Sequence, residues 1–229
     1  MIPERLREDG LELSRRLRRA RLLPVLRTRE PGRAEAVGRA LIESGATVLE
    51  VALTSPDAFE TIAALSASQC LIGAASVVDR AGLEAAVAAR ADFLVCPHLD
   101  PELVEASREA GRPLIPAAAT PSEALLARRL GCELIKVFPA RELGGPAFIK
   151  ALLAPLPGLC LLPAGGIGLE DVAAYLEAGA WCAAVGGSLL RHELMDAEDW
   201  TGVGRLFAET QRRLCLERFS EKQPDPDTL

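Results

Sequence analysis

The chain repeats one pattern about eight times, at intervals of roughly 20 to 25 residues. A short apolar stretch is followed each time by an amphipathic stretch rich in Ala, Leu, Glu and Arg. The apolar stretches are residues 22–28, 47–54, 71–77, 93–97, 113–119, 134–139, 160–164 and 182–186. Because each is too apolar for a half-exposed strand, they are expected to be parallel strands buried on both faces.

The amphipathic stretches between these strands are expected to be helices on the outside of the sheet. They are residues 34–44, 56–66, 80–89, 101–110, 121–130, 146–154, 169–178 and 203–218. Gly45, Gly111, Gly131 and Gly179 lie where four of these helices should end, as helix C-caps do. No G-x-G-x-x-G follows the first strand, so the α/β class is expected to be a closed (β/α)8 TIM barrel and not an open doubly wound sheet.

A length of 229 residues fits one compact domain. Residues 1–20 are expected to form an additional N-terminal helix that caps the bottom of the barrel. Residues 21–219 are assigned to the single barrel. Residues 220–229 are polar and rich in proline, and are expected to be a disordered tail.

Charge and apolar patterning point to a small-molecule substrate. The formal net charge of −6 argues against a nucleic-acid partner, which normally meets a basic face. No apolar run reaches the roughly 18 residues that cross a bilayer, and no secretory h-region is present, so we expect a cytoplasmic protein without a membrane partner. The six cysteines contain no C-x-x-C pair; they are expected to be reduced and mostly buried.

Two charged residues interrupt apolar strands near the ends where barrel enzymes bind their substrates: Glu50 in VLEVAL and Lys136 in LIKVFP. Lys136 is one of only three lysines among 26 basic residues. A lysine in a chain that otherwise uses arginine indicates a task that arginine cannot perform, such as losing a proton and attacking a carbonyl. The competing interpretation is a buried ion pair that only fixes packing, although such pairs stabilise weakly.

A glycine-rich cluster follows the last two strands. Gly165 and Gly166 follow the seventh strand, and Gly186 and Gly187 follow the eighth. Backbone N–H groups at such glycines can approach an anion closely, which favours a phosphate site at this corner of the barrel. The alternative is that the paired glycines only make tight turns.

Other candidate residues carry weaker signals. Arg27, after the first strand, is a candidate for holding a carboxylate or else a surface residue. Ser76, Thr120 and Ser188 are candidate hydroxyl donors or ordinary helix caps. His98 follows the fourth strand and is a candidate for contacting a ligand, or else a structural or solvated histidine.

Several segments together match a known family in order and spacing. They are VLEVALTSP, LIGAASV, FLVCP, PLIPAAATPSE, IKVFPA, GGPAFIKAL, LPAGGI and VGGSLL. Over residues 22–190 the chain resembles the 2-keto-3-deoxy-6-phosphogluconate aldolase / 2-keto-4-hydroxyglutarate aldolase family. The resemblance implies a homotrimeric barrel in which Lys136 forms a Schiff base with pyruvate and Glu50 moves the protons, with no metal or organic cofactor.

The resemblance also assigns substrate contacts. It places phosphate on Gly165, Gly166, Gly187 and Ser188, and it places Ser76, Pro97 and Phe138 around the pyruvyl group. Some members carry an arginine at the position of Thr54, whereas Arg27 with Thr54 is similar to the arrangement in 2-keto-3-deoxy-6-phosphogalactonate aldolase.

The implied reaction is cleavage of a 2-keto-3-deoxy-6-phospho sugar acid to pyruvate and glyceraldehyde 3-phosphate, or of 4-hydroxy-2-oxoglutarate to pyruvate and glyoxylate. Ala75, His98, Ala117 and Ala164 depart from the commonest family pattern and crowd the pocket. A galactonate-type aldolase, a non-catalytic phosphate-binding barrel and another phosphate-binding barrel enzyme are the alternatives.

Overall fold

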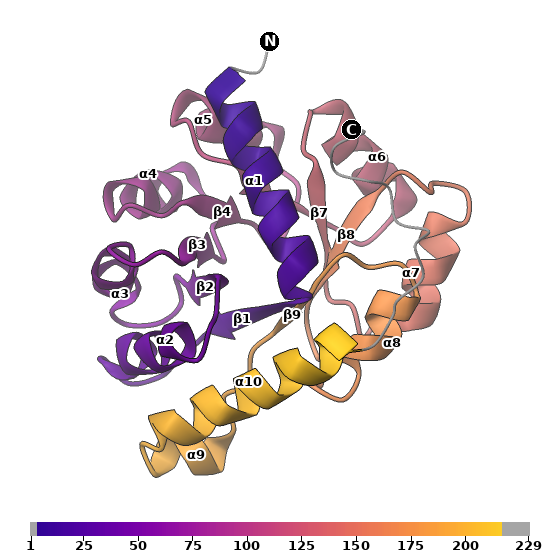
Figure 1. Cartoon of the computed structure of the whole chain (residues 1–229). Helices are drawn as coiled ribbons and strands as arrows, with labels where there is room; N and C mark the ends of the chain where they lie inside the picture. Colours follow the sequence, from indigo (N-terminus) through magenta and orange to yellow (C-terminus); the bar gives the residue numbers. More distant parts are fainter. Residues whose placement is uncertain (1–3, 217–229) are drawn as a thin grey trace.

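Parallel strands curl into a barrel in the computed structural model of this protein, which describes residues 4–216 (Figure 1). The strands are β1 Leu22–Leu26, β2 Val48–Ala52, β3 Leu71–Ala75, β4 Phe93–Val95, β5 Leu114–Ile115, β6 Ala117–Ala118, β7 Leu134–Val137, β8 Cys160–Pro163 and β9 Ala183–Val185. They pair in the orders β5-β4-β3-β2-β1-β9 and β6-β7-β8. The (β/α)8 TIM-barrel fold class expected from the repeat is confirmed.

Two junctions join these sheets into one barrel. The single strand expected at 113–119 is divided into β5 and β6 by Pro116, which has no N–H to donate to a neighbouring strand. On the other side, a parallel bridge between Ala164 and Ala184 links the end of β8 to β9.

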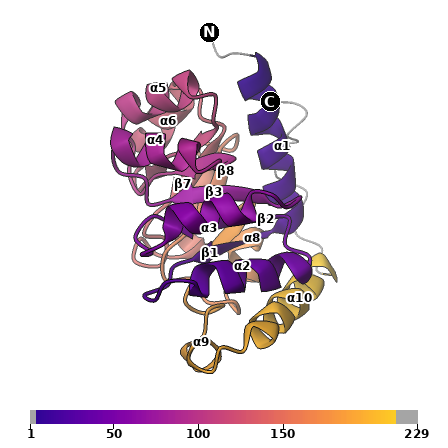
Figure 2. The ribbon, with the colours of Figure 1, turned by 90° about the vertical axis from the view of Figure 1, so that its left-hand side faces the viewer.

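Helices cover the outside of the barrel (Figures 1 and 2). They are α2 Arg33–Glu43, α3 Ala58–Leu65, α4 Arg80–Ala88, α5 Pro101–Glu109, α6 Pro121–Arg129, α7 Pro146–Leu153, α8 Val172–Glu177, α9 His192–Asp196 and α10 Trp200–Leu216. Their sequence signals are local: Asp79, Asp100 and Thr120 accept hydrogen bonds from the first turns of α4, α5 and α6, as N-caps do. Thr120 is therefore a helix cap. All four expected C-cap glycines have positive φ.

The inside of the barrel has its own apolar core, distinct from the layer between strands and helices. Leu23, Val48 and Leu134 belong to this inner core. Since side chains alternate along a strand, Glu50 and Lys136, two positions further, also point inward. The sequence pattern thus places both charges inside the barrel.

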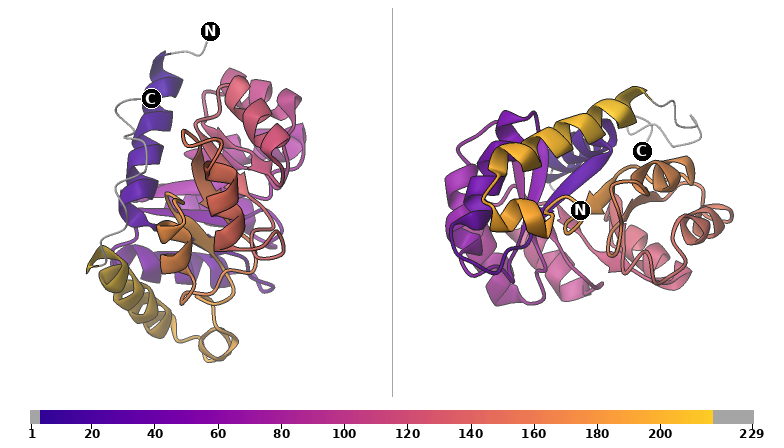
Figure 3. Two further views of the ribbon diagram at one scale, coloured as in Figure 1. Left: turned by 90° about the vertical axis from the view of Figure 1, so that its right-hand side faces the viewer. Right: turned by 90° about the horizontal axis from the view of Figure 1, so that it is seen from below.

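Helix α1, Glu4–Ala20, lies at one end of the barrel (Figures 2 and 3). Leu13, Leu17 and Ala20 belong to the inner core, so α1 covers the amino ends of the strands. None of the helices in residues 4–216 has the length and apolar character needed to cross a membrane. The expected tail at 220–229 lies outside the described residues, and the division into domains stays a prediction.

Some helices also differ from the sequence prediction. Helix α10 begins at Trp200, before the expected start at 203, and the short helix α9 was not predicted. The cysteines follow the expectation: all six are free thiols, and five of them are buried, with Cys215 exposed.

Candidate active site

A cavity of about 680 Å³ opens at the carboxyl ends of the strands, within the size range of small-molecule sites. Most of the sequence-predicted site residues line it. They are Arg27, Glu50, Lys136, Phe138, Gly165, Gly166, Gly187 and Ser188.

Glu50 and Lys136 meet at the floor of this cavity. Nζ of Lys136 lies 4.0 Å from Oε1 of Glu50. Glu50 has no exposed surface, and Lys136 retains 8%. Neither carboxylate oxygen of Glu50 has a hydrogen-bond partner within residues 4–216. The two groups are therefore in charge contact without the hydrogen bonds that a structural ion pair needs.

Burial dominates the protonation of Glu50. It raises the pKa of this carboxyl above the ordinary value of 4.5, while the positive charges of Lys136 and then Arg27 pull it down. A carboxyl with a raised pKa can hold a proton at a higher pH than a solvated one, which suits general acid–base work.

Phe138 forms one wall beside the lysine. The Lys136 Nζ atom lies 5.3 Å from the centre of the Phe138 ring, within the range of a cation–π contact. The backbone continues through a cis peptide bond between Phe138 and Pro139.

Arg27 extends from the end of β1 into the same cavity. Its Nη2 atom donates to Oγ of Ser76 at 3.2 Å. The guanidinium is exposed, so it retains donors for a ligand carboxylate. Ser76, which has a positive φ of 64°, contacts Arg27 and is not itself among the residues that line the cavity.

Glycines after β8 and β9 form part of the lining of the cavity, the glycine rim. Gly165 and Gly166 have φ of 95° and 70°, a region that side chains disfavour. A Cβ atom on Gly165 would lie 3.0 Å from Cε2 of Phe138, so glycine also permits the close approach of that ring. Ser188 donates to the carbonyl of Ile167 at 3.3 Å and lines the cavity.

Two predicted contacts lie away from this cavity. Thr54 is exposed and Pro97 is half-buried, and neither lines the cavity. His98 is exposed and is also outside its lining. The assignment of Thr54, Ser76 and Pro97 to the substrate stays a prediction.

Three charged residues of the cavity were not predicted: Arg141, Glu170 and Asp171. Arg141 lies in a loop, where no periodicity indicates the direction of a side chain. Glu170 and Asp171 were expected in a helix beginning at residue 169, whereas α8 begins at Val172. Arg141 follows β7 by four residues, and a charge at that end of a barrel strand was the available signal.

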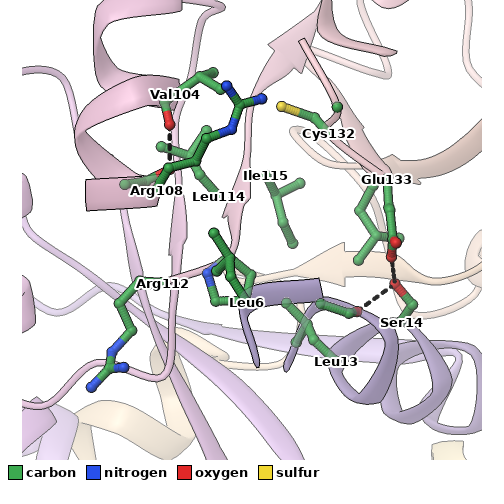
Figure 4. A pocket seen from close by; sticks show the side chains of 15 residues that line it. Leu6, Leu13, Ser14, Val104, Arg108, Arg112, Leu114, Ile115, Cys132 and Glu133 are labelled. Carbon is green, nitrogen blue, oxygen red and sulfur yellow. Dashed lines mark hydrogen bonds between the residues drawn. The ribbon is translucent and has the colours of Figure 1, made fainter. Parts of the chain in front are cut away.

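A second, smaller cavity of about 80 Å³ lies at the amino ends of the strands, beside α1 (Figure 4). Leu6 and Leu13 face it, and Ser14 donates to Glu133 at 3.3 Å. Arg112 donates to the carbonyl of Ala91 at 2.8 Å. Several of its polar groups thus already have protein partners.

Known proteins resemble this chain in sequence and in structure. The family model described as KDPG and KHG aldolase matches residues 13–206. A 2-dehydro-3-deoxy-phosphogluconate aldolase of Pseudomonas aeruginosa is 36% identical over 208 residues, covering 89% of this chain and 91% of the relative. A probable 2-dehydro-3-deoxy-6-phosphogalactonate aldolase of Rhizobium meliloti is also 36% identical, over 74% of this chain and 82% of the relative.

Among solved structures, a KDPG aldolase of Legionella pneumophila, captured with pyruvate as a covalent carbinolamine intermediate, is 28% identical, with a TM-score of 0.79. The alignment covers 86% of this chain and 97% of that one. Since the family model spans most of the barrel and the relatives match over most of their own length, the chain belongs to the KDPG and KHG aldolase family.

Proposed function

We propose that this chain is a class I pyruvate aldolase in which Lys136 is the Schiff-base residue and Glu50 the proton carrier. One observation carries the assignment of these roles. Lys136 Nζ and a fully buried Glu50 carboxyl lie 4.0 Å apart on the floor of a cavity large enough for a sugar acid. Membership of the family makes the chain an aldolase and hence a lyase.

The chemistry begins with attack of the Lys136 amine on the C2 carbonyl of a 2-keto acid. Loss of water from the carbinolamine gives a protonated imine. This imine accepts the electron pair of the breaking C3–C4 bond and becomes an enamine, while the C4 hydroxyl proton passes to Glu50. Protonation of the enamine at C3 and hydrolysis of the imine then release pyruvate and the free lysine.

The remaining groups suit the two ends of a phosphorylated 2-keto acid. Arg27, oriented by Ser76, is assigned to the C1 carboxylate, since a guanidinium pairs with a carboxylate through two N–H groups. The loops at Gly165, Gly166, Gly187 and Ser188 are assigned to the phosphate. The products are pyruvate and glyceraldehyde 3-phosphate, or pyruvate and glyoxylate from 4-hydroxy-2-oxoglutarate.

A galactonate-type substrate is the second candidate. It is favoured by the arginine at the end of β1 in combination with an exposed Thr54, and by the Rhizobium meliloti relative. Parallel cleavage assays with 2-keto-3-deoxy-6-phosphogluconate and its C4 epimer, coupled to pyruvate detection, distinguish the two. A kcat/KM at least tenfold higher for the epimer would assign the galactonate-type activity.

Borohydride trapping tests the Schiff base directly. The protein is incubated with pyruvate and sodium borohydride, and the modified peptide is located by mass spectrometry. The expected result is one pyruvyl adduct on Lys136, absent from Lys136→Ala and present in Lys150→Ala, because Lys150 is exposed on α7. A folded wild-type protein without an adduct would overturn the aldolase mechanism and favour a barrel that only binds phosphate ligands.

The proposal includes a homotrimer that works in the cytoplasm without a metal or organic cofactor. Its support is the likeness to the family. Light scattering after size-exclusion chromatography measures the mass in solution. Three times the chain mass of 24.3 kDa is expected, and a monomer at micromolar concentration would contradict the trimer.

A further inference from the structure

Arg141 lies on a segment held tightly against the glycine rim. The backbone N–H of Ala140 donates to the carbonyl of Ala164 at 2.8 Å, and that of Arg141 donates to the carbonyl of Gly165 at 3.2 Å. These bonds extend the β7–β8 pairing beyond the strands. The position of the Arg141 backbone relative to the glycine loop is therefore fixed.

The Arg141 side chain lies over Gly166. A Cβ atom added to Gly166 would be 2.8 Å from Cβ and 2.9 Å from Cδ of Arg141, closer than such atoms can approach. Nη1 of Arg141 donates to the carbonyl of Gly166 at 3.4 Å. The bare glycine thus provides the space in which the arginine stem lies, and the guanidinium remains beside the loop.

The positive charge of Arg141 is not neutralised within the described part of the chain. No carboxylate there lies within 4.0 Å of it, whereas Arg39 pairs with Glu35 and Arg80 pairs with Glu84 and Glu109. Glu170 and Asp171 line the same cavity without reaching it. One long hydrogen bond leaves most of the five N–H groups of the guanidinium directed to the cavity and solvent.

We propose that Arg141 binds the phosphate of the substrate and makes the enzyme prefer phosphorylated 2-keto acids. This inference rests on the proposed function. Backbone N–H groups of the glycine rim bind a phosphate through partial charges, whereas a guanidinium adds a full charge and a planar pair of donors. 4-Hydroxy-2-oxoglutarate ends in a carboxylate at C5 and has no group at the phosphate position, so Arg141 favours the longer substrate.

Kinetics with both substrate types test the proposal. We expect Arg141→Gln to lower kcat/KM for the 6-phospho acid roughly ten- to hundredfold more than for 4-hydroxy-2-oxoglutarate, mainly through KM, since a hydrogen bond to a charged group is lost. Arg141→Lys keeps the positive charge but not the planar pair of donors, so its kcat/KM for the 6-phospho acid should lie between those of Arg141→Gln and the wild type. Arg129→Gln is the matched control, because Arg129 is an exposed arginine at the opposite end of the barrel, in the last turn of α6.

Binding of inorganic phosphate, measured by titration calorimetry, gives a readout that needs no turnover. The dissociation constant for phosphate is expected to rise at least about tenfold in Arg141→Gln and to stay at the wild-type value in Arg129→Gln. Equal losses for both substrates, or unchanged phosphate affinity in a variant that keeps the wild-type unfolding midpoint, would overturn the role of Arg141. Failure of the aldolase proposal is seen separately, as a missing pyruvyl adduct in the wild type.

Discussion

Replacing Glu50 with glutamine separates the catalytic from the structural interpretation of the buried pair. At 4.0 Å and an effective dielectric constant near 20, the attraction between the two charges is about 4 kcal/mol. Removing an ionised carboxylate from water costs several kcal/mol. Because burial outweighs the attraction and raises the pKa of Glu50, the ionised pair is not expected to add to the free energy of unfolding.

Glutamine has the same shape as Glu50 and no charge. Because the Glu50 oxygens already lack hydrogen-bond partners among the described residues, the substitution breaks no hydrogen bond there. We expect the free energy of unfolding at pH 8, measured by urea denaturation, to fall by no more than about 1 kcal/mol relative to the wild type. The value of kcat should fall about 10²- to 10⁴-fold, because a general acid–base contributes on that order.

The control is Glu60→Gln, a change of the same chemistry at an exposed position of α3, which should leave kcat and stability at wild-type values. A purely structural pair predicts the opposite pattern for Glu50→Gln. Breaking a buried ion pair costs about 3 to 5 kcal/mol. A loss of that size, together with less than about a tenfold fall in kcat, would refute the assignment of Glu50 as the proton carrier.

Three further predictions concern stability and packing. Because burial raises the pKa of Glu50 in the folded protein, the unfolded state loses this proton at a lower pH. The free energy of unfolding of the wild type should therefore decline relative to that of Glu50→Gln as the pH rises above 4.5, by up to about 1.4 kcal/mol per pH unit. Parallel pH profiles of the two proteins in urea denaturation would contradict this. Gly166→Ala, at φ 70°, should lower the free energy of unfolding by about 1 to 2 kcal/mol. The added methyl group should also displace Arg141 and so raise KM for a phosphorylated substrate. An unchanged KM would count against the described packing. Gly73→Ala places a Cβ atom 2.3 Å from the Phe93 ring and should lower the free energy of unfolding by about 1 to 3 kcal/mol. Gly10→Ala on α1, where the nearest atom is 3.7 Å away, is its control and should not destabilise.

The sequence was sufficient to predict the barrel and the floor of its site, for one physical reason. A strand buried on both faces cannot hold a charge without a cause, so Glu50 and Lys136 stood out within their apolar segments. The period of two then fixed their direction, because Val48 and Leu134 face the same interior. Strand periodicity determines both which residues are unusual and where they point.

In loops, side chains do not alternate in direction as they do along a strand, and there the predictions were incomplete. The direction of Arg141 depends on the bare surface of Gly166 and on hydrogen bonds between two loops, which are tertiary features. The position of Thr54 outside the cavity has the same origin, since it lies beyond the last residue of β2. The division of one expected strand at Pro116 was visible in the sequence only as a proline within an apolar run.

The raised pKa of Glu50 depends on parts of the fold that never meet the substrate. On the neighbouring strand β3, Gly73 is the residue that pairs with Glu50. The Phe93 ring occupies the space that a side chain at Gly73 would fill. Beneath them, Leu13 and Leu17 of α1 close the amino end of the barrel within the same inner core. Glu50 therefore lies where a dry, packed interior meets the open cavity, and from there it can hold a proton yet reach the substrate. A change that let water into the amino end would accordingly lower the pKa of Glu50 without touching the active site.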